Sequence, residues 1–158
     1  MDYKIRKLKQ DEYGILADFL YEAIYIPQGV DAPPRSIIEQ PELQLYISQF
    51  GKEADYALAA EADGRIVGVA WARIMEDYGH IDDETPSLAI SLYKKYRGQG
   101  IGTELMRQLL QLLKENNYKR ASLSVQKANY ACKMYQKLGF ETVEENKEEY
   151  IMVKQLTK

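Results

Sequence analysis

The sequence predicts a mixed α+β fold, in which helices flank a central sheet. Three observations support this prediction. Several short runs alternate apolar and polar residues, as half-buried strands do, whereas others place apolar residues at helical spacing. A glycine-rich segment at residues 97–102 joins one such strand to one such helix. The elements follow in the order β, α, α, β, β, β, α, β, α, β, β, and we expect them to form a single domain over residues 1–158.

The first half of the chain predicts a strand, two helical segments and a hairpin. Leu16, Phe19 and Leu20 share one face of the first helix. Pro41 divides the next helical stretch into two short helices, and Asp63-Gly64 is a strong hairpin turn signal. The expected elements are a strand at Tyr3–Leu8, a helix at Asp11–Ile24, an irregular loop at Ile26–Pro34, two helices within Arg35–Phe50, and strands at Tyr56–Ala62 and Ile66–Met75.

The second half predicts four strands and two helices. Ser87–Tyr93 alternates small or polar residues with large aliphatic ones. From Ile101 onward, leucines recur at helical spacing, and Asn129 and Gly139 suit the start and the end of a second helix. The remaining strands are expected at Ala121–Val125, Phe140–Glu144 and Tyr150–Lys154.

Composition excludes several classes of function. The net charge is −3, from 21 basic and 24 acidic residues, so the chain has no electrostatic footprint for nucleic acid. The N-terminus is charged and no 18-residue apolar run occurs, so we expect no membrane partner. A single cysteine fits a reducing cytoplasm, and one histidine, His80, without cysteine partners makes a metal site unexpected.

Residues Arg97-Gly98-Gln99-Gly100-Ile101-Gly102 predict an anion-binding loop. A loop that leads from a strand into a helix leaves backbone N–H groups free and directs the positive end of the helix dipole at a ligand. Lys94, Lys95 and Arg97 add cationic side chains at the same point in the sequence. The most natural ligand for such a loop is a phosphate group.

Two common phosphate loops do not fit this segment. A P-loop ends in Gly-Lys-Ser/Thr, whereas Gly102 is followed by Thr103-Glu104. A dinucleotide-binding loop needs a third glycine at the position of Thr103 and an acidic residue about 20 positions later, where this chain has Lys119-Arg120. The pattern that remains is Arg-x-x-Gly-x-Gly.

This pattern, together with a second block downstream, resembles the GNAT superfamily of N-acetyltransferases. In the second block Asn129 opens a short helix, Tyr135 follows six residues later, and the helix ends in Gly139-Phe140. Cys132 stands where the family usually has alanine, a small change in volume. The order and spacing of both blocks match the family, and the resemblance covers the whole chain.

The resemblance implies a mostly antiparallel sheet with one splayed pair of parallel strands, and acetyl-CoA as co-substrate. It implies that the backbone N–H of Leu92 faces the acetyl carbonyl, where a preorganised donor contributes about 3 kcal/mol. The cofactor-binding residues it implies are Leu92, Tyr93, Lys94, Arg97, Gly98, Gln99, Gly100, Ile101, Gly102, Thr103, Asn129 and Tyr135.

Tyr135 occupies the family's general-acid position. A phenol titrates near 10 and a thiol near 8.5, so full proton transfer to the departing thiolate would be uphill by roughly 2 kcal/mol. We therefore expect the hydroxyl mainly to donate a hydrogen bond to the sulfur as negative charge develops. Complete transfer would require a site that lowers the pKa of Tyr135.

The general base is less determined by the sequence. Some members of the family place a catalytic glutamate where this chain has Glu84, before the strand that leads to the glycine loop. Asp82, Asp83, His80 and Glu61 are alternatives, and water can relay the proton when the amine is weakly basic.

The acceptor is a small-molecule or peptide amine of unknown identity. The resemblance assigns its site to the first helices and the nearby loops, here Tyr21, Tyr25, Ile26–Arg35 and Asp77–Glu84. A non-catalytic acyl-CoA-binding regulatory module is the alternative function, although a binding module needs no proton donor at Tyr135. A homodimer formed through edge strands is also possible.

Overall fold

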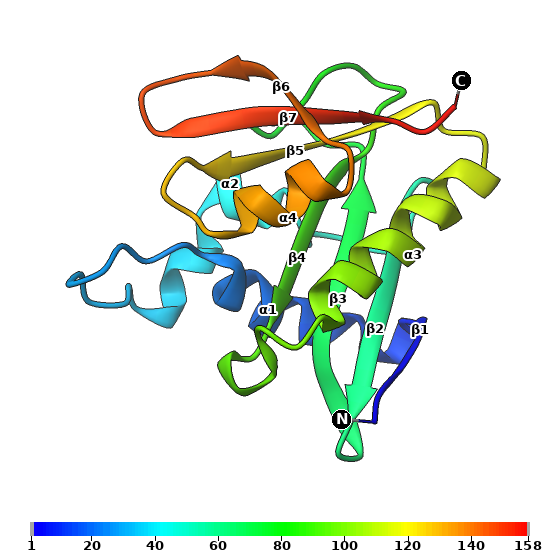
Figure 1. Ribbon diagram of the computed structural model, residues 1–158. Coiled ribbons are helices and arrows are strands. Elements are labelled where there is room, and N and C mark those ends of the chain that lie inside the picture. The colour runs from blue at the N-terminus through cyan, green and yellow to red at the C-terminus, as the bar shows by residue number, and fades with distance from the viewer. Residues whose placement is uncertain (1, 158) are drawn as a thin grey trace.

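The computed structural model describes residues 2–157, which form a seven-stranded sheet with helices on both faces (Figure 1). The strands lie in the order β1-β2-β3-β4-β5-β7-β6. They are β1 (Lys4–Lys7), β2 (Tyr56–Ala62), β3 (Arg65–Arg73), β4 (Ser87–Leu92), β5 (Arg120–Gln126), β6 (Glu141–Glu145) and β7 (Glu149–Gln155). All neighbouring pairs are antiparallel except β4 and β5, which are parallel. The expected mixed fold is confirmed.

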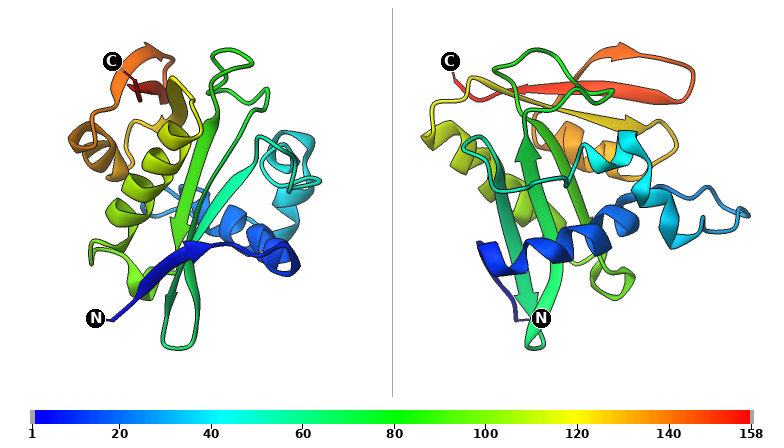
Figure 2. Two further views of the ribbon diagram at one scale, coloured as in Figure 1. Left: turned by 90° about the vertical axis from the view of Figure 1, so that its right-hand side faces the viewer. Right: turned by 180° about the vertical axis from the view of Figure 1, so that it is seen from behind.

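The helices divide between the two faces of the sheet, as the left-hand view of Figure 2 shows. One face carries α3 (Ile101–Glu115) and α4 (Ala131–Lys137). The other carries α1 (Leu16–Ala23), the 3₁₀ helix η2 (Arg35–Glu39) and the short α2 (Pro41–Gln44). Two further 3₁₀ turns are η1 (Gln10–Ile15) and η3 (Lys94–Tyr96). No helix within residues 2–157 combines the length and the apolar character needed to cross a bilayer.

Alternation along the strands supplies both faces with apolar side chains. On β2, Leu58 and Ala60 belong to the core beneath α3, whereas Ala57 and Ala59 belong to the core beneath α1. This is the period-2 pattern of a strand that is covered on both sides. The sheet therefore separates two apolar cores, one beneath α3 and one beneath α1.

Helix α3 begins close against β4. A Cβ atom on Gly102 would lie 3.1 Å from Cδ1 of Leu92 and 3.9 Å from Sδ of Met134, so a larger residue would push the helix away from the strand. Leu105 and Leu109 then bury the apolar stripe of the helix. The glycine loop is thereby held at the C-terminal end of β4.

The parallel strands β4 and β5 pair at one position and then diverge. Ser87 is the residue of β4 registered with Ser122 of β5, and among residues 2–157 no further register pair joins the two strands. The backbone N–H of Ser122 donates to the carbonyl of Pro86 at 3.0 Å, at the same end. We call the unpaired edges beyond this point, residues 88–92 of β4 and 123–126 of β5, the splay. Its open end lies beside the start of α3 and beside α4 (Figure 1). The splayed pair is therefore confirmed.

Most element boundaries agree with the sequence prediction, with one difference in the first helix. The expected helix at Asp11–Ile24 is a 3₁₀ turn, η1, followed by an α-helix that begins only at Leu16. Gly14 lies within this turn, and glycine is a poor helix former. Pro41 separates two short helices as expected, because it starts α2 at its first position.

Candidate functional site

The splay exposes backbone donors of β4. The N–H of Tyr93 donates to the carbonyl of Val67 on β3 at 3.0 Å. N–H groups alternate in direction along a strand, so those of Leu92 and Ile90 point away from β3, toward β5. The N–H of Leu92 is therefore directed into the splay, with no partner on β3.

The glycine loop presents a series of free amides next to the splay. Among residues 2–157, no acceptor receives the backbone N–H groups of residues 98–103. Gly98 and Gly100 have positive φ values of 75° and 86°, which side-chain-bearing residues rarely adopt. Nothing lies within 4 Å of a Cβ built on either glycine. The loop that comprises Gly98, Gln99, Gly100, Ile101, Gly102 and Thr103 therefore forms an open nest of donors at the positive end of α3, suited to a diphosphate.

The Arg97 side chain, one of the cations expected beside the loop, is engaged by neighbouring groups. Nε donates to the carbonyl of Leu92 at 2.9 Å, and Nη2 lies 3.2 Å from the carbonyl and 3.3 Å from the carboxylate of Glu22. The carbonyl of Leu92 has no partner on β5 because the strands diverge there, and Arg97 satisfies it. The side chain thus connects the end of β4 to the end of α1.

The remaining residues near the loop divide into two groups. Lys94 and Lys95 are exposed on η3, and Lys95 lies over the ring of Tyr96 at 5.6 Å. Tyr93 does not face the splay, because its amide is bonded to β3 and its ring packs on Phe19 with centroids 4.7 Å apart. The amide and the ring of Tyr93 are therefore engaged by β3 and α1, whereas the ammonium groups of Lys94 and Lys95 remain available for phosphate.

Tyr135 lies on α4 in the same core as Leu92, and 8% of its surface is exposed. Its ring packs edge-on against Phe140. Among residues 2–157 its hydroxyl has no hydrogen-bond partner. Every fully buried side-chain oxygen in this part of the chain has a partner, so the Tyr135 hydroxyl is not fully buried and reaches accessible surface. Burial raises the pKa of Tyr135 above its ordinary value, and Cys132 adds to this effect. The phenol therefore stays protonated at neutral pH, and its O–H group donates no hydrogen bond within residues 2–157.

Asn129 and Cys132 organise the helix that carries Tyr135. Oδ1 of Asn129 accepts from the backbone N–H of Ala131 at 2.9 Å, which is the helix-start role expected for this residue. Sγ of Cys132 contacts the carbonyl of Gln126 at 3.4 Å, and burial raises the pKa of its thiol. The Cys132 contact joins α4 to the end of β5.

The structure does not bring Glu84 into the splay. Glu84 is exposed in the loop before Ser87, beyond the end at which β4 and β5 are paired. Its neighbour Asp82 is engaged by Thr85 and Arg120, and Asp83 is 91% exposed beside His80. Glu61 forms ion pairs with Lys4 and Arg6 near the opposite end of the sheet.

Sequence reasoning missed a polar cluster at Ser87, the end at which β4 and β5 are paired. The Tyr46 hydroxyl donates to Oδ2 of Asp77 at 3.0 Å, and the Ser87 hydroxyl donates to Oδ1 of Asp77 at 2.9 Å. The sequence places Asp77 only in a loop near the expected acceptor site. Tyr46 carried no motif, and only the packing of its segment against β3 brings it near β5.

The loop of residues 24–34, which is expected to contact the acceptor, also lies on the α1 side of the sheet. The Tyr21 hydroxyl donates to the carbonyl of Pro33 at 2.6 Å, which holds the loop of residues 24–34 against α1. The Tyr25 hydroxyl lies 3.3 Å from the carbonyl of Ala128, which connects that loop to the segment between β5 and α4. These two bonds place the loop beside the open end of the splay.

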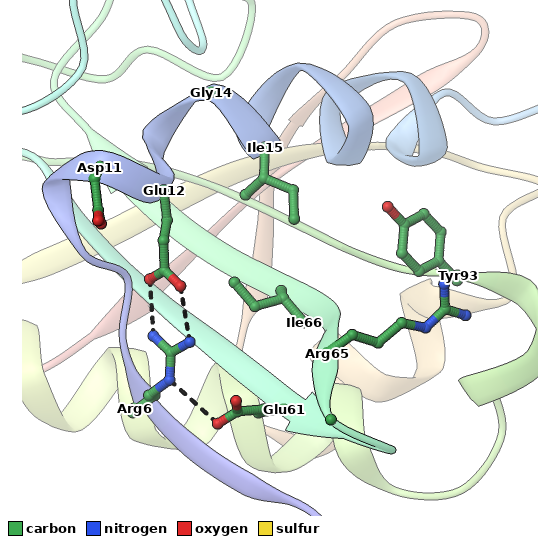
Figure 3. A pocket seen from close by; sticks show the side chains of 10 residues that line it. Arg6, Asp11, Glu12, Gly14, Ile15, Glu61, Arg65, Ile66 and Tyr93 are labelled. Carbon is green, nitrogen blue, oxygen red and sulfur yellow. Dashed lines mark hydrogen bonds and ion pairs between the residues drawn. The ribbon is translucent and has the colours of Figure 1, made fainter.

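A separate hollow of about 490 Å³ lies at the far end of β2 and β3 (Figure 3). Arg6 and Glu12 form two bonds of 2.9 Å across it, and Arg6 also contacts Glu61 at 3.4 Å. This pairing lowers the pKa of Glu12 to about 2. Arg65 lies over the Tyr93 ring at 5.4 Å. The charges in this hollow largely satisfy one another, so it is a weaker candidate for a ligand than the splay.

Comparisons with known proteins agree with this geometry. The sequence model described as "Acetyltransferase (GNAT) family" matches residues 19–140. A Bacillus subtilis (strain 168) protein, whose name proposes it as an alanine N-acetyltransferase for ribosomal protein bS18, is 32% identical over 85 residues, 53% of this chain and 52% of that protein. The human N-acetylaspartate synthetase is 33% identical over 82 residues, 51% of this chain and 26% of that protein. The chain thus spans about half or less of the length of these curated relatives.

Among solved structures, the PaiA N-acetyltransferase of Thermoplasma acidophilum in complex with coenzyme A superimposes with a TM-score of 0.69. The match covers 98% of this chain and 99% of that one, at 21% sequence identity. At this identity the likeness establishes the fold.

Proposed function

Because the chain belongs to the GNAT acetyltransferase family, we propose that it transfers an acetyl group from acetyl-CoA to a primary amine by direct attack in a ternary complex. The observation that carries this proposal is the coincidence of three features at one place. These are the splayed edge of β4, the free amides of residues 98–103, and the unused hydroxyl of Tyr135.

In this proposal the glycine loop binds the diphosphate of acetyl-CoA through its amides, with Lys94 and Lys95 as auxiliary cations. The pantetheine arm then lies along the unpaired edge of β4, where it replaces the missing strand partner. This places the thioester carbonyl near the N–H of Leu92, which stabilises the oxyanion that forms when the amine attacks.

The proposed chemical step requires neither a bound metal nor a covalent intermediate. The amine nitrogen forms a bond to the acetyl carbon, the carbon–sulfur bond breaks, and its electron pair remains on sulfur. Tyr135 donates a hydrogen bond to that sulfur. The products are an amide and coenzyme A, and an acceptor that starts as an ammonium ion releases one proton overall.

The names of the relatives suggest candidate acceptors. The Bacillus protein is named for the alanine of a ribosomal protein, and the human protein for the synthesis of N-acetylaspartate. A peptide N-terminus and a free amino acid are therefore both reasonable first substrates. Other primary amines belong in the same panel.

The proposal is tested by calorimetric titration with coenzyme A and by release of free thiol from acetyl-CoA in the presence of an amine panel. We expect saturable binding of coenzyme A and amine-dependent thiol release with the acetylated amine identified by mass. Absence of coenzyme A binding would contradict the proposal. Binding without thiol release across the panel would instead favour an acyl-CoA-binding regulatory module.

A further inference from the structure

The side chain of Arg97 joins the ends of two elements. Its Nε donates to the carbonyl of Leu92 at 2.9 Å, and its Nη2 donates to the carbonyl of Glu22 at 3.2 Å. Leu92 is the last residue of β4, and its carbonyl faces the splay, where no strand is paired with it. Glu22 lies in the last turn of α1, where carbonyls have no partner within the helix. One guanidinium therefore satisfies unpaired acceptors of a strand and of the helix packed on that strand.

Electrostatics favours the same position of Arg97. Helix α1 has no basic residue in its last turn, so a cation from outside complements the negative end of its dipole. Nη2 also lies 3.3 Å from the carboxylate of Glu22. The Arg97 and Glu22 side chains are 43% and 28% exposed, so solvent screens this ion pair, and the two carbonyl bonds define the geometry. A lysine has a single nitrogen and cannot reach the two carbonyls through separate atoms.

The end of α1 leads directly into the loop that is expected to contact the acceptor, residues 24–34. The Ser91 hydroxyl donates to the carbonyl of Phe19 at 2.6 Å, which is a second bond between β4 and α1. Beyond the helix, the Tyr25 hydroxyl holds the loop beside the open end of the splay. Arg97 therefore lies between the strand edge proposed for the thioester and the start of the acceptor loop.

The exposed lysines of η3 are better placed than Arg97 to bind phosphate. Lys94 and Lys95 form no ion pair among residues 2–157, whereas Arg97 would have to leave three acceptors to reach a ligand. The amides of residues 98–103 already supply donors for a diphosphate. In the proposed reaction the loop and the two lysines are thus sufficient for the phosphates, and the contacts of Arg97 point to a different task.

Resting on the proposed acetyl transfer, we propose that Arg97 is a positioning residue that fixes the end of β4 relative to the end of α1 and does not bind the diphosphate. The carbonyl of Leu92 and the N–H of Tyr93 belong to one peptide group, which Arg97 and the carbonyl of Val67 hold from opposite sides. With this peptide held, the adjacent N–H of Leu92 keeps its direction into the splay. With α1 held by the same guanidinium, the amine meets the thioester in one geometry, and a small displacement lowers the rate steeply.

The test compares acetyl-CoA with S-acetylpantetheine, which carries the same thioester but no phosphate. L-Alaninamide, or failing that the best amine of the panel, is the acceptor, and thiol release gives kcat/KM. We expect Arg97→Met to lower kcat/KM at least tenfold with both donors, by factors that agree within threefold. In the matched control, Lys94→Met combined with Lys95→Met, the loss should be confined to acetyl-CoA. A loss in Arg97→Met that is confined to acetyl-CoA, or no loss with either donor, would overturn the inference.

Two further variants keep the test decisive if Arg97→Met does not fold. Arg97→Lys retains a cation for phosphate but not the separate donors, so it should show a similar loss with both donors. Glu22→Ala keeps a good helix former in α1. It should raise the KM for the amine at least threefold and leave the KM for acetyl-CoA within twofold. An unchanged amine KM, or a lower KM for acetyl-CoA because Arg97 is released toward phosphate, would refute the connection to α1.

A double-mutant cycle assigns the Glu22 effect to Arg97. Once Arg97→Met has removed the guanidinium, Glu22→Ala should no longer change the amine KM, because the two side chains act through one contact. Additive effects of the two substitutions would contradict this coupling. Absence of coenzyme A binding, or of thiol release by the unaltered protein with every amine of the panel, would instead refute the acetyl transfer on which the inference rests.

Discussion

Tyr135 has properties that favour hydrogen bonding over full proton transfer. Its hydroxyl has no partner among residues 2–157, and burial raises its pKa above the ordinary value for tyrosine. A raised pKa increases the energy needed to give the proton completely to a thiolate. A neutral hydroxyl that donates to sulfur as charge builds still stabilises the transition state, because this bond strengthens as the reaction proceeds.

We predict that Tyr135→Phe lowers kcat at least tenfold and leaves the affinity for coenzyme A within twofold, because only the hydroxyl is lost. Steady-state thiol release and calorimetric titration measure the two quantities. Tyr130→Phe is the control, since Tyr130 is 81% exposed and adjoins the same helix, so it should retain wild-type kinetics. Unchanged turnover in Tyr135→Phe would remove the phenol from the mechanism.

At the scale of elements, function depends on an irregularity of the sheet. β4 and β5 pair at Ser87 and Ser122 and then separate, which leaves donors of β4 without partners. Unpaired backbone groups in an interior are costly, so they are normally satisfied by protein, water or ligand. Arg97 satisfies the carbonyl of Leu92, whereas the N–H of Leu92 is left for the proposed thioester.

The glycine loop at the end of β4 gives a test at this scale. We predict that Gly100→Ala weakens coenzyme A binding at least tenfold, because a residue with a Cβ resists the φ of 86° that orients the loop amides. Gly64→Ala is the matched control, since Gly64 has a φ of 76° and open space in the β2–β3 turn. Both variants should lose about 1 kcal/mol of stability in urea unfolding. Equal coenzyme A affinity of the two variants would argue against the loop as the diphosphate site.

At the scale of the whole molecule, a buried ion pair attaches the segment before β2 to the sheet. Arg73 of β3 and Asp55 are 6% and 4% exposed and lie 3.0 Å apart. Arg73 also donates to the carbonyls of Leu45 and Ser48. Tyr46 lies between those two residues in the chain, so this cluster also fixes the segment whose phenol donates to Asp77.

We predict that Asp55→Asn costs about 3 kcal/mol in the free energy of unfolding, because it leaves the Arg73 charge buried without a counter-charge. Urea denaturation followed by circular dichroism measures this cost. The exposed pair of Arg107 and Glu104 provides the comparison, and Arg107→Gln should cost less than about 1 kcal/mol. Equal losses of unfolding free energy in the two variants would show that the buried Arg73–Asp55 pair stabilises the fold no more than an exposed pair does.

The sequence by itself determined the features that are encoded locally. Hydrophobic periodicity predicted the strands and the long helix, Asp63-Gly64 predicted the β2–β3 turn, and the spacing of glycines predicted the loop before α3. Asn129 was likewise predicted at the start of its helix. Each of these depends on neighbouring residues alone, so pattern and composition are sufficient evidence.

Only the tertiary structure decided which distant side chains meet. The engagement of Arg97 by Leu92 and Glu22 depends on how α1 packs against β4. Glu84 lies outside the splay because β4 and β5 are paired at Ser87, the end of β4 that follows the Glu84 loop. Tyr46 and Asp77 are 31 residues apart in the chain, and they meet because the segment of Tyr46 packs against β3, where Trp71 donates to the carbonyl of Tyr46. Strand order and splay arise from packing across the whole sheet, and no local pattern records them.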